Sequence, residues 1–387
     1  MNELLQIIES GGSLFDEKEG YRQIPYVDLS VRSKDEKEEL LSCISRVLDS
    51  GQYVGISCCE EFESAIAAYC GVPRALAVSS GTDALCLALR VLSIGPGDEV
   101  ITVPNSHFAS VASIVQAGAK PVFVDVGPDQ NIDIKLIEPA ITKNTKAIMP
   151  VHLTGRVCDM PSIMEIAEAY ELLVVEDAAQ AVGATFNNRM AGTFGDAGAF
   201  SAHPLKNLNA IGDAGYLFVR DIENFERASR LRNHGLEDRD TVLEWGNVSR
   251  MDAIQSEVLT LRLKNLDEVI SRRRRNARFY NENIKSRTIQ LPRFDDLKQC
   301  TFHTYVIQAE ERDLLAQRLH ERGIGTAIHY PVPLHLQPSA IGCGYSRGDF
   351  PVAEALADKI LSIPIHQCLE LQDLEYIAHH IDELSGY

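Results

Sequence analysis

The sequence has no apolar run of the roughly 20 residues that a membrane helix needs, and its N-terminus has no basic start followed by an apolar block. A soluble, unexported protein of the cytoplasm is therefore expected. None of its nine cysteines stands in a C-x-x-C pair, a spacing that many zinc and redox sites use. This pattern fits unpaired thiols in a reducing compartment, and no metal site is expected.

Basic residues are outnumbered, with 37 lysines and arginines against 55 acidic residues and a net charge of -18 at pH 7. Such a charge repels phosphate backbones and anionic membranes, so neither nucleic acid nor a membrane is an expected partner. One catalytic motif is also missing. The sequence has no G-x-G-x-x-G for a nicotinamide dinucleotide.

Short apolar runs rich in branched residues alternate with segments of helical periodicity, which predicts an α/β protein with a mostly parallel sheet. The predicted strands lie at 75–78, 99–103, 121–126, 147–151 and 172–175. The predicted helices lie at 83–92, 107–117, 132–141 and 162–170. In such sheets, binding sites gather where the strands end.

Three parts are predicted along the chain: an N-terminal extension at 1–23, a large α/β domain at 24–250 and a smaller α+β domain at 251–387. The last part has helical patterns at 254–266 and 272–284 and strand-like pieces at 303–307 and 325–329. The four arginines at 272–275 interrupt this pattern. A charge block of this kind usually marks a solvated or interface face.

Three polar motifs each follow a predicted strand. Gly81 and Thr82 begin a helix whose free N–H groups and dipole can hold a phosphate, although an ordinary helix cap is the alternative. Asp177 ends an apolar strand, where it can hold a cationic ligand or cap the structure. Lys206 lies between apolar strands, where burial can lower its pKa and make it a nucleophile toward carbonyls.

A phosphate seat, a carboxylate and a lysine at the ends of strands of one sheet are what pyridoxal phosphate requires. The phosphate needs the helix N-terminus, the ring nitrogen needs a carboxylate, and the aldehyde needs a lysine amine. Several histidines could suggest a metal instead, but they lack ligand spacing and are read as core or site-shaping residues. They are His152, His203, His234 and His303.

Linked motifs at 51–55, 79–85, 151–155, 176–180, 200–215 and 325–331 resemble, in this order, the DegT/DnrJ/EryC1/StrS family of sugar aminotransferases. The resemblance implies the aspartate-aminotransferase-like fold, the type I fold of pyridoxal phosphate enzymes. That fold has a large, mostly parallel sheet domain and a smaller α+β C-terminal domain.

The resemblance also implies roles for individual residues. Lys206 would bind the cofactor covalently, Asp177 would pair with its ring nitrogen and Gln180 would approach its ring hydroxyl. The phosphate would be held by Gly81, Thr82 and Ser201, the ring face would be covered by His107, and the substrate would be met by His329 and Tyr330. Thr326 and His335 are further expected donors to sugar hydroxyls or a diphosphate.

One departure from the family pattern lies at 246–250. Family members usually carry Gly-x-Asn-Ser-Arg there, with the asparagine reaching the phosphate of the neighbouring subunit's cofactor. This chain has Val248 at that position, which cannot donate. The contact then falls to Asn247, Ser249, Arg250 or nothing. The resemblance still implies a homodimer with shared active sites.

The expected reaction is a ping-pong transfer of an amino group from glutamate or glutamine to a nucleotide-linked keto-sugar, with pyridoxamine phosphate as intermediate. The product would serve amino-sugar or polysaccharide biosynthesis. Lys206 favours the aminotransferase branch of this family, because the dehydratase branch has histidine at the same position. The turn at 212–215 favours amination at carbon 3. The alternatives are a 4-keto-sugar aminotransferase and a non-catalytic regulatory protein that binds the cofactor.

Overall fold

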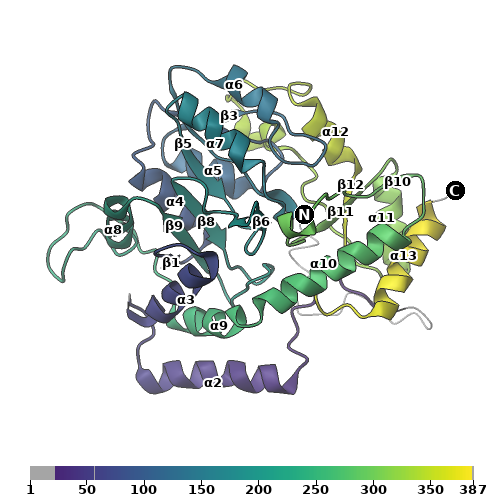
Figure 1. The fold of residues 1–387 in the computed structure, drawn as a ribbon, viewed down its shortest axis with the longest axis horizontal. Helices are drawn as coiled ribbons and strands as arrows, with labels where there is room; N and C mark the ends of the chain where they lie inside the picture. Colours follow the sequence, from purple (N-terminus) through teal and green to yellow (C-terminus); the bar gives the residue numbers. More distant parts are fainter. Residues whose placement is uncertain (1–21, 56, 386–387) are drawn as a thin grey trace.

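The structure is a computed structural model that describes residues 22–55 and 57–385. The extension predicted at 1–23 lies almost wholly outside these residues. Figure 1 shows a large part around a central sheet, a smaller part beside it, and the long helix α10 running from one to the other. In the same view the helix α2 stands apart at the bottom.

The large part is built on a seven-stranded sheet with the order β1-β9-β8-β5-β4-β2-β3. Only β9 runs antiparallel to its neighbours, so the predicted α/β fold with a mostly parallel sheet is confirmed. Its strands are β1 (Leu76–Val78), β2 (Glu99–Thr102), β3 (Lys120–Phe123), β4 (Thr145–Ile148), β5 (Leu173–Asp177), β8 (Ala197–Ser201) and β9 (Gly215–Val219). A separate two-stranded hairpin consists of β6 (Thr185–Phe186) and β7 (Arg189–Met190).

The large part also contains eight described helices. They are α2 (Lys34–Ser50), α3 (Glu60–Cys70), α4 (Gly81–Val91), α5 (Phe108–Gln116), α6 (Ile137–Ala140), α7 (Met160–Ala169), α8 (Ile222–Leu231) and α9 (Ala253–Leu263). The helix predicted at 132–141 is instead a 3₁₀ turn followed by the single turn α6. Pro139 lies in that turn and supplies no N–H to continue a helical ladder.

The small part carries the antiparallel sheet β10-β11-β12. Its elements are α10 (Leu266–Asn283), β10 (Ile289–Gln290), β11 (Tyr305–Ala309), α11 (Arg312–Glu321), α12 (Pro351–Lys359), β12 (Ile360–Ile363) and α13 (Leu371–Ser385). The strand predicted at 325–329 is not formed. Its segment makes only isolated bridges, from Ile324 to Ile24 and from Ala327 to Ser362.

Side-chain packing bears on the predicted boundary between the domains. Met251, Leu259 and Leu263 share one apolar core with Phe62 and Phe200 of the large part. At the other end of the chain, Ile24 packs in the core of the small part. We therefore propose that the boundary lies within α10 rather than after residue 250, and that the segment around residue 24 belongs with the small part.

The arginine block on α10 differs from the expected solvated face. Arg273 is 5% exposed and donates to the carbonyls of Phe302 and His303. Arg274 is half-buried and donates to the carbonyl of Cys300. Because α10 passes beneath the loop at 300–303, two of the four arginines hold that loop, while Arg272 and Arg275 are exposed.

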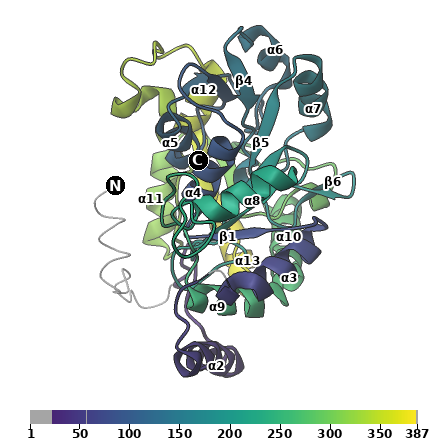
Figure 2. The same ribbon diagram turned by 90° about the vertical axis from the view of Figure 1, so that its left-hand side faces the viewer.

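Two elements extend from the body of the large part. Figure 2 shows α2 below the remainder of the chain, where it packs on α9 through a small apolar cluster. The segment 232–250 after α8 forms a loop that protrudes from the molecule in Figure 1. Among the described helices, none is both long enough and apolar enough to cross a lipid bilayer.

Candidate active site

A cavity of about 350 Å³ opens where β1, β5 and β8 end. Nine of the twelve residues expected at the site line it, although they come from separate elements. These residues are Gly81, Thr82, His107, Asp177, Gln180, Ser201, Lys206, His329 and Tyr330. The carboxyl ends of the parallel strands meet at one edge of the sheet, which explains how distant motifs converge here.

The N-terminus of α4 forms one end of the cavity. Ser80 caps this helix, since its hydroxyl accepts the Asp83 N–H at 3.1 Å. A Cβ on Gly81 would lie 2.8 Å from the Cβ of Ser201, which is too close for any side chain at position 81. The glycine thus lets β8 and the first turn of α4 approach, and their N–H and hydroxyl groups together form a seat for an anion.

Asp177 is held rigidly at the end of β5. It is 5% exposed, and its Oδ2 accepts the Ser110 hydroxyl at 2.7 Å while its Oδ1 accepts the Ala179 N–H at 3.2 Å. Ser110 was not predicted as a site residue. It lies three residues after His107 on α5, and this helical spacing is the only feature of the sequence that points to it.

Lys206 follows β8 and points its amine into the cavity. Burial lowers the pKa of Lys206 to about 8, although attraction to Asp177 opposes this shift. Its Nζ lies 3.5 Å from His303 Nε2. A substantial share of the amine is therefore neutral near physiological pH, as a nucleophile toward a carbonyl must be.

Gln180 and His107 shape the middle of the cavity. Gln180 accepts the Thr154 N–H at 2.7 Å and donates to the Tyr330 hydroxyl at 3.4 Å. The His107 ring caps α5 by accepting the Ala109 N–H, and its centroid lies 5.8 Å from that of Tyr330. Burial, with Lys206 nearby, lowers the pKa of His107 and so favours its neutral form.

Histidines are concentrated in this cavity. Burial lowers the pKa of His203 and lowers that of His329 to about 4, so both are neutral at physiological pH. His203 and His303, which were expected to be core or site-shaping residues, also line the cavity. Among the described residues that line the cavity, Lys206 is the only lysine or arginine.

Three other predicted residues do not line the cavity. Asn247 is exposed on the protruding loop, where its backbone bonds to Leu231 and His234. Its expected role concerns a second subunit and stays a prediction. His335 is 3% exposed and bonds to Glu354 at 2.9 Å, so the expectation of a substrate donor there is wrong, and Thr326 also lies outside the lining.

Sequence comparison decides the family. The profile of the DegT/DnrJ/EryC1/StrS aminotransferase family matches residues 34–382. The chain belongs to this family. Its members bind pyridoxal phosphate, and the chain is accordingly a pyridoxal-phosphate-dependent aminotransferase.

Named relatives extend over most of the chain. The dTDP-3-amino-3,4,6-trideoxy-alpha-D-glucose transaminase of Streptomyces venezuelae is 41% identical over 350 residues, covering 90% of this chain and 92% of the relative. The dTDP-3-amino-3,6-dideoxy-alpha-D-galactopyranose transaminase of Aneurinibacillus thermoaerophilus is 40% identical over 367 residues, covering 94% and 100%. The crystal structure of S. venezuelae DesV in complex with a ketimine intermediate has a TM-score of 0.91 at 40% identity, covering 94% and 99%. The expected fold is thereby confirmed.

The cavity fits the cofactor of the family. The seat at α4 suits its phosphate, the buried Asp177 carboxylate suits its ring nitrogen, and the depressed pKa of Lys206 suits its aldehyde. Bound there, pyridoxal phosphate supplies an electron sink and carries the amino group. The side chains that line the cavity would hold the cofactor and orient it, and Lys206 would move the proton.

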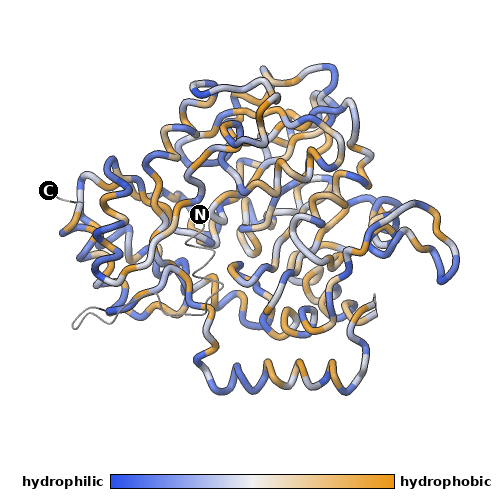
Figure 3. Tube along the Cα trace, turned by 180° about the vertical axis from the view of Figure 1, so that it is seen from behind, coloured by the Kyte–Doolittle hydropathy of each residue, from blue (hydrophilic) through white to orange (hydrophobic). Residues whose placement is uncertain are grey.

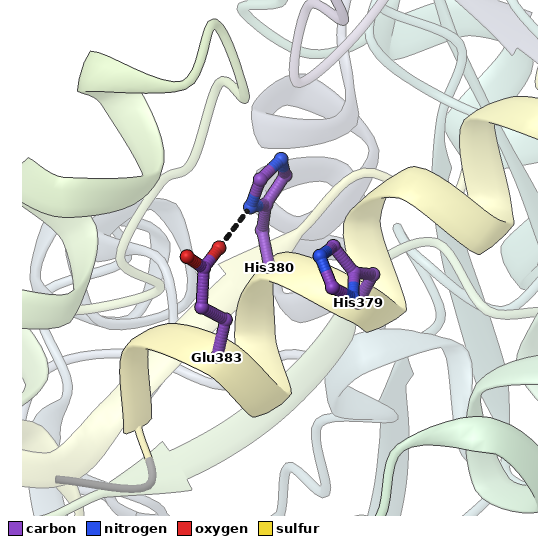
Figure 4. Close-up of side chains that lie close together, drawn as sticks. All are labelled: His379, His380 and Glu383. Carbon is purple, nitrogen blue, oxygen red and sulfur yellow. Dashed lines mark hydrogen bonds and ion pairs between the residues drawn. The ribbon is translucent and has the colours of Figure 1, made fainter.

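A different group of possible metal ligands stands on α13, outside this cavity. It comprises His379, His380 and Glu383 (Figure 4). His380 Nδ1 lies 2.8 Å from Glu383, and Arg322 approaches the same carboxylate at 3.7 Å. The carboxylate thus already has two partners, and the hydrogen bond from His380 lowers the pKa of Glu383.

Proposed function

We propose that the protein transfers an amino group from glutamate or glutamine to carbon 3 of a nucleotide-linked keto-sugar. The observation that carries this proposal is the cavity itself, in which Lys206 stands among neutral donors. His329 and Tyr330 face the same space as the lysine amine and suit sugar hydroxyls. Enzymes specific for dicarboxylic keto acids usually present an arginine to the second carboxylate.

The position of amination is supported by the names of the relatives. Both transaminases described above are named for 3-amino sugars. Asp213, the acidic residue of the turn at 212–215, lines the cavity near His203. In this proposal Lys206 acts as the general base that takes a proton from the donor's carbon and as the acid that returns one to the sugar carbon.

A homodimer with shared active sites is also part of the proposal. The cofactor phosphate, the amino donor and a nucleotide diphosphate are all anions, yet within residues 22–55 and 57–385 Lys206 is the one lysine or arginine that lines the cavity. The protruding loop carries Arg239 and Arg250, and its Trp245 is 84% exposed. Figure 3 shows hydrophobic residues along α2 as well, where Leu41 and Leu48 are exposed. The protruding loop and α2 suit docking of a second copy of the chain, whose loop arginines would bring positive charge to the cavity.

The deciding assay uses purified holoenzyme with glutamate or glutamine and a panel of dTDP- and UDP-linked 3-keto and 4-keto sugars. We expect an amino sugar whose nitrogen NMR places on carbon 3, with 2-oxo acid formed in equal amount. Amination of keto acids alone, or of carbon 4, would contradict the proposal. The panel also identifies the nucleotide.

The shared site has its own test. Lys206→Ala and Asn247→Asp are expected to be inactive alone, the second because a carboxylate would repel the neighbour's phosphate. Mixed dimers should recover activity, because one site then has an intact lysine and an intact loop. A monomer in sedimentation, or no recovery after verified subunit exchange, would contradict the dimer.

A regulatory role without turnover is the alternative function. A "Pleiotropic regulatory protein" of Geobacillus stearothermophilus is 38% identical over 364 residues, covering 93% of this chain and 98% of that protein. The sugar assay separates the two functions, because a purely regulatory protein forms no amino sugar. A cytoplasmic location is proposed on the nine unpaired cysteines, which suit a reducing compartment.

A further inference from the structure

A second, smaller cavity lies behind Lys206. Its volume is about 30 Å³, and a buried water needs roughly 10–15 Å³. Its lining consists of Tyr26, Val27, Leu205, Arg273, His303, His329, Ile365 and His366. His303 and His329 also line the cofactor cavity, so their rings form part of the wall between the two spaces.

Two histidines of this rear cavity each have one buried nitrogen without a protein partner. No group of residues 22–55 or 57–385 hydrogen-bonds to His303 Nδ1 or to His366 Nδ1. Buried polar atoms are rarely left in this state, because the loss of water is not compensated. Both histidines line a cavity that has room for a water, which is what a polar hydration site requires.

The hydrogen bond at Nε2 of each histidine decides whether its Nδ1 carries a proton. His366 Nε2 lies 3.2 Å from the Pro25 carbonyl, so it carries the proton and leaves Nδ1 as an acceptor. His303 Nε2 faces the Lys206 amine at 3.5 Å. When Lys206 is an ammonium it donates there, and the neutral His303 ring then carries its proton on Nδ1. One ring that lines the cavity thus has a free donor, and the other has a free acceptor.

Charges around the rear cavity keep both rings neutral. Arg273 is buried, and no carboxylate lies within 4.0 Å of it among the described residues. Burial lowers the pKa of Arg273 to about 10, so it remains a cation at physiological pH. Burial, Lys206 and Arg273 lower the pKa of His303, while burial and Arg273 lower that of His366 to about 4.

The remaining titratable neighbours do not alter this assignment. His329 and His203 face His303 and also favour its neutral form. Tyr26 stays protonated because burial raises its pKa, and it bonds to Ser362, which in turn lies 2.9 Å from His329 Nδ1. Asp177 faces Lys206 from β5, and Asp28 faces His366 from outside the cavity.

We propose that the rear cavity holds an ordered water that accepts from His303 Nδ1 and donates to His366 Nδ1, which makes His303 a positioning residue for the Lys206 amine. The water selects the tautomer of His303 whose Nε2 accepts a hydrogen bond from the lysine. No net proton is transferred to either ring. The inference rests on Lys206 as the acting amine of the proposed function, but not on the identity of the sugar.

The test measures the pKa of Lys206 in the apoenzyme, from the pH dependence of its labelling by a small amine reagent followed by peptide mass spectrometry. A hydrogen bond to the ammonium raises a lysine pKa. His303→Leu should therefore lower the midpoint by about half a unit to one unit. Val27→Ile, which fills the rear cavity and leaves both histidines in place, should shift it in the same direction.

Two further variants keep the inference falsifiable. His366→Leu removes the acceptor from the cavity together with the donor to the Pro25 carbonyl, so it should also lower the midpoint. His203→Leu removes an imidazole of the same active site that does not bond to Lys206, and it should leave the midpoint unchanged. A crystal structure should show the water within hydrogen-bonding distance of both Nδ1 atoms, and Val27→Ile should displace it.

An unchanged midpoint in folded Val27→Ile and His366→Leu would overturn the inference, as would a rear cavity without a bridging water in well-defined density. Failure of the sugar assay leaves this result intact, because the labelling needs no substrate. If the sugar is aminated but the midpoints do not move, the proposed function stands and only the role of the water fails.

Discussion

Replacing Lys206 by methionine should make the cofactor-free protein more stable at neutral pH. Burial lowers the pKa of this lysine from its ordinary 10.5 to about 8, so below pH 8 the folded chain carries an ammonium that it stabilises poorly. At about 1.36 kcal/mol per pKa unit, this costs up to about 3 kcal/mol. Methionine has similar length and no charge, and it packs readily in apolar surroundings.

The pH dependence gives this prediction its sign. Between pH 8 and 10.5 the unfolded chain binds more protons than the folded one, so the stability of the unmodified protein rises with pH there. The gain from Lys206→Met should therefore be full at pH 7 and vanish by pH 10.5. Urea unfolding of both apoproteins across this range measures it.

Lys143→Met is the matched control, because this lysine is exposed in the turn before β4 and its replacement should change stability little at any pH. Equal stability of the Lys206→Met and unmodified apoproteins at pH 7 would refute the reasoning. So would a gain that stays constant from pH 7 to 10.5, because it would come from packing rather than from the charge. Stability lost to a functional group is a common compromise in active sites.

Three other predictions concern the cofactor. Asp177→Asn should retain cofactor binding but lose at least about 100-fold in kcat, because the ring nitrogen would no longer stay protonated; near-normal turnover would exclude this role. Gly81→Ala should weaken cofactor binding at least about tenfold through its clash with Ser201. Adding Ser201→Gly should restore part of the affinity, because it removes the Cβ that the new alanine would meet. Gly95→Ala is the control, because a Cβ there has room. An unchanged cofactor affinity in Gly81→Ala would contradict the close contact. The holoenzyme should be yellow, and borohydride should fix the cofactor to Lys206; mass spectrometry that finds the adduct at another residue would disprove the assignment.

The central strands and the pocket were predictable because both depend on local sequence. Apolar runs mark buried strands, and a polar residue directly after such a run falls at the edge of the sheet, as Asp177 does. Ser110 was not predictable in this way. Its bond to Asp177 depends on how α5 lies across β5, which no local pattern records.

The misjudged residues have a related cause. A block of arginines indicates charge but not burial, and Arg273 becomes buried only because α10 runs between the two parts of the molecule. His335 resembled a substrate donor by its place in a motif, yet its partner Glu354 comes from α12. In each case a distant segment decides the environment, and a single sequence does not show that segment.

The antiparallel strand β9 has a consequence for the order of events during synthesis. β1 forms an edge of the sheet and pairs with β9, whose residues lie about 140 positions later in the chain. Closing so long a loop is entropically costly and slow compared with local pairing. A nascent chain that ends before Gly215 can already contain Asp177 and Lys206, but it has no partner for the strand that leads into α4. Capture of the cofactor phosphate is therefore expected to be a late event in the biogenesis of this enzyme.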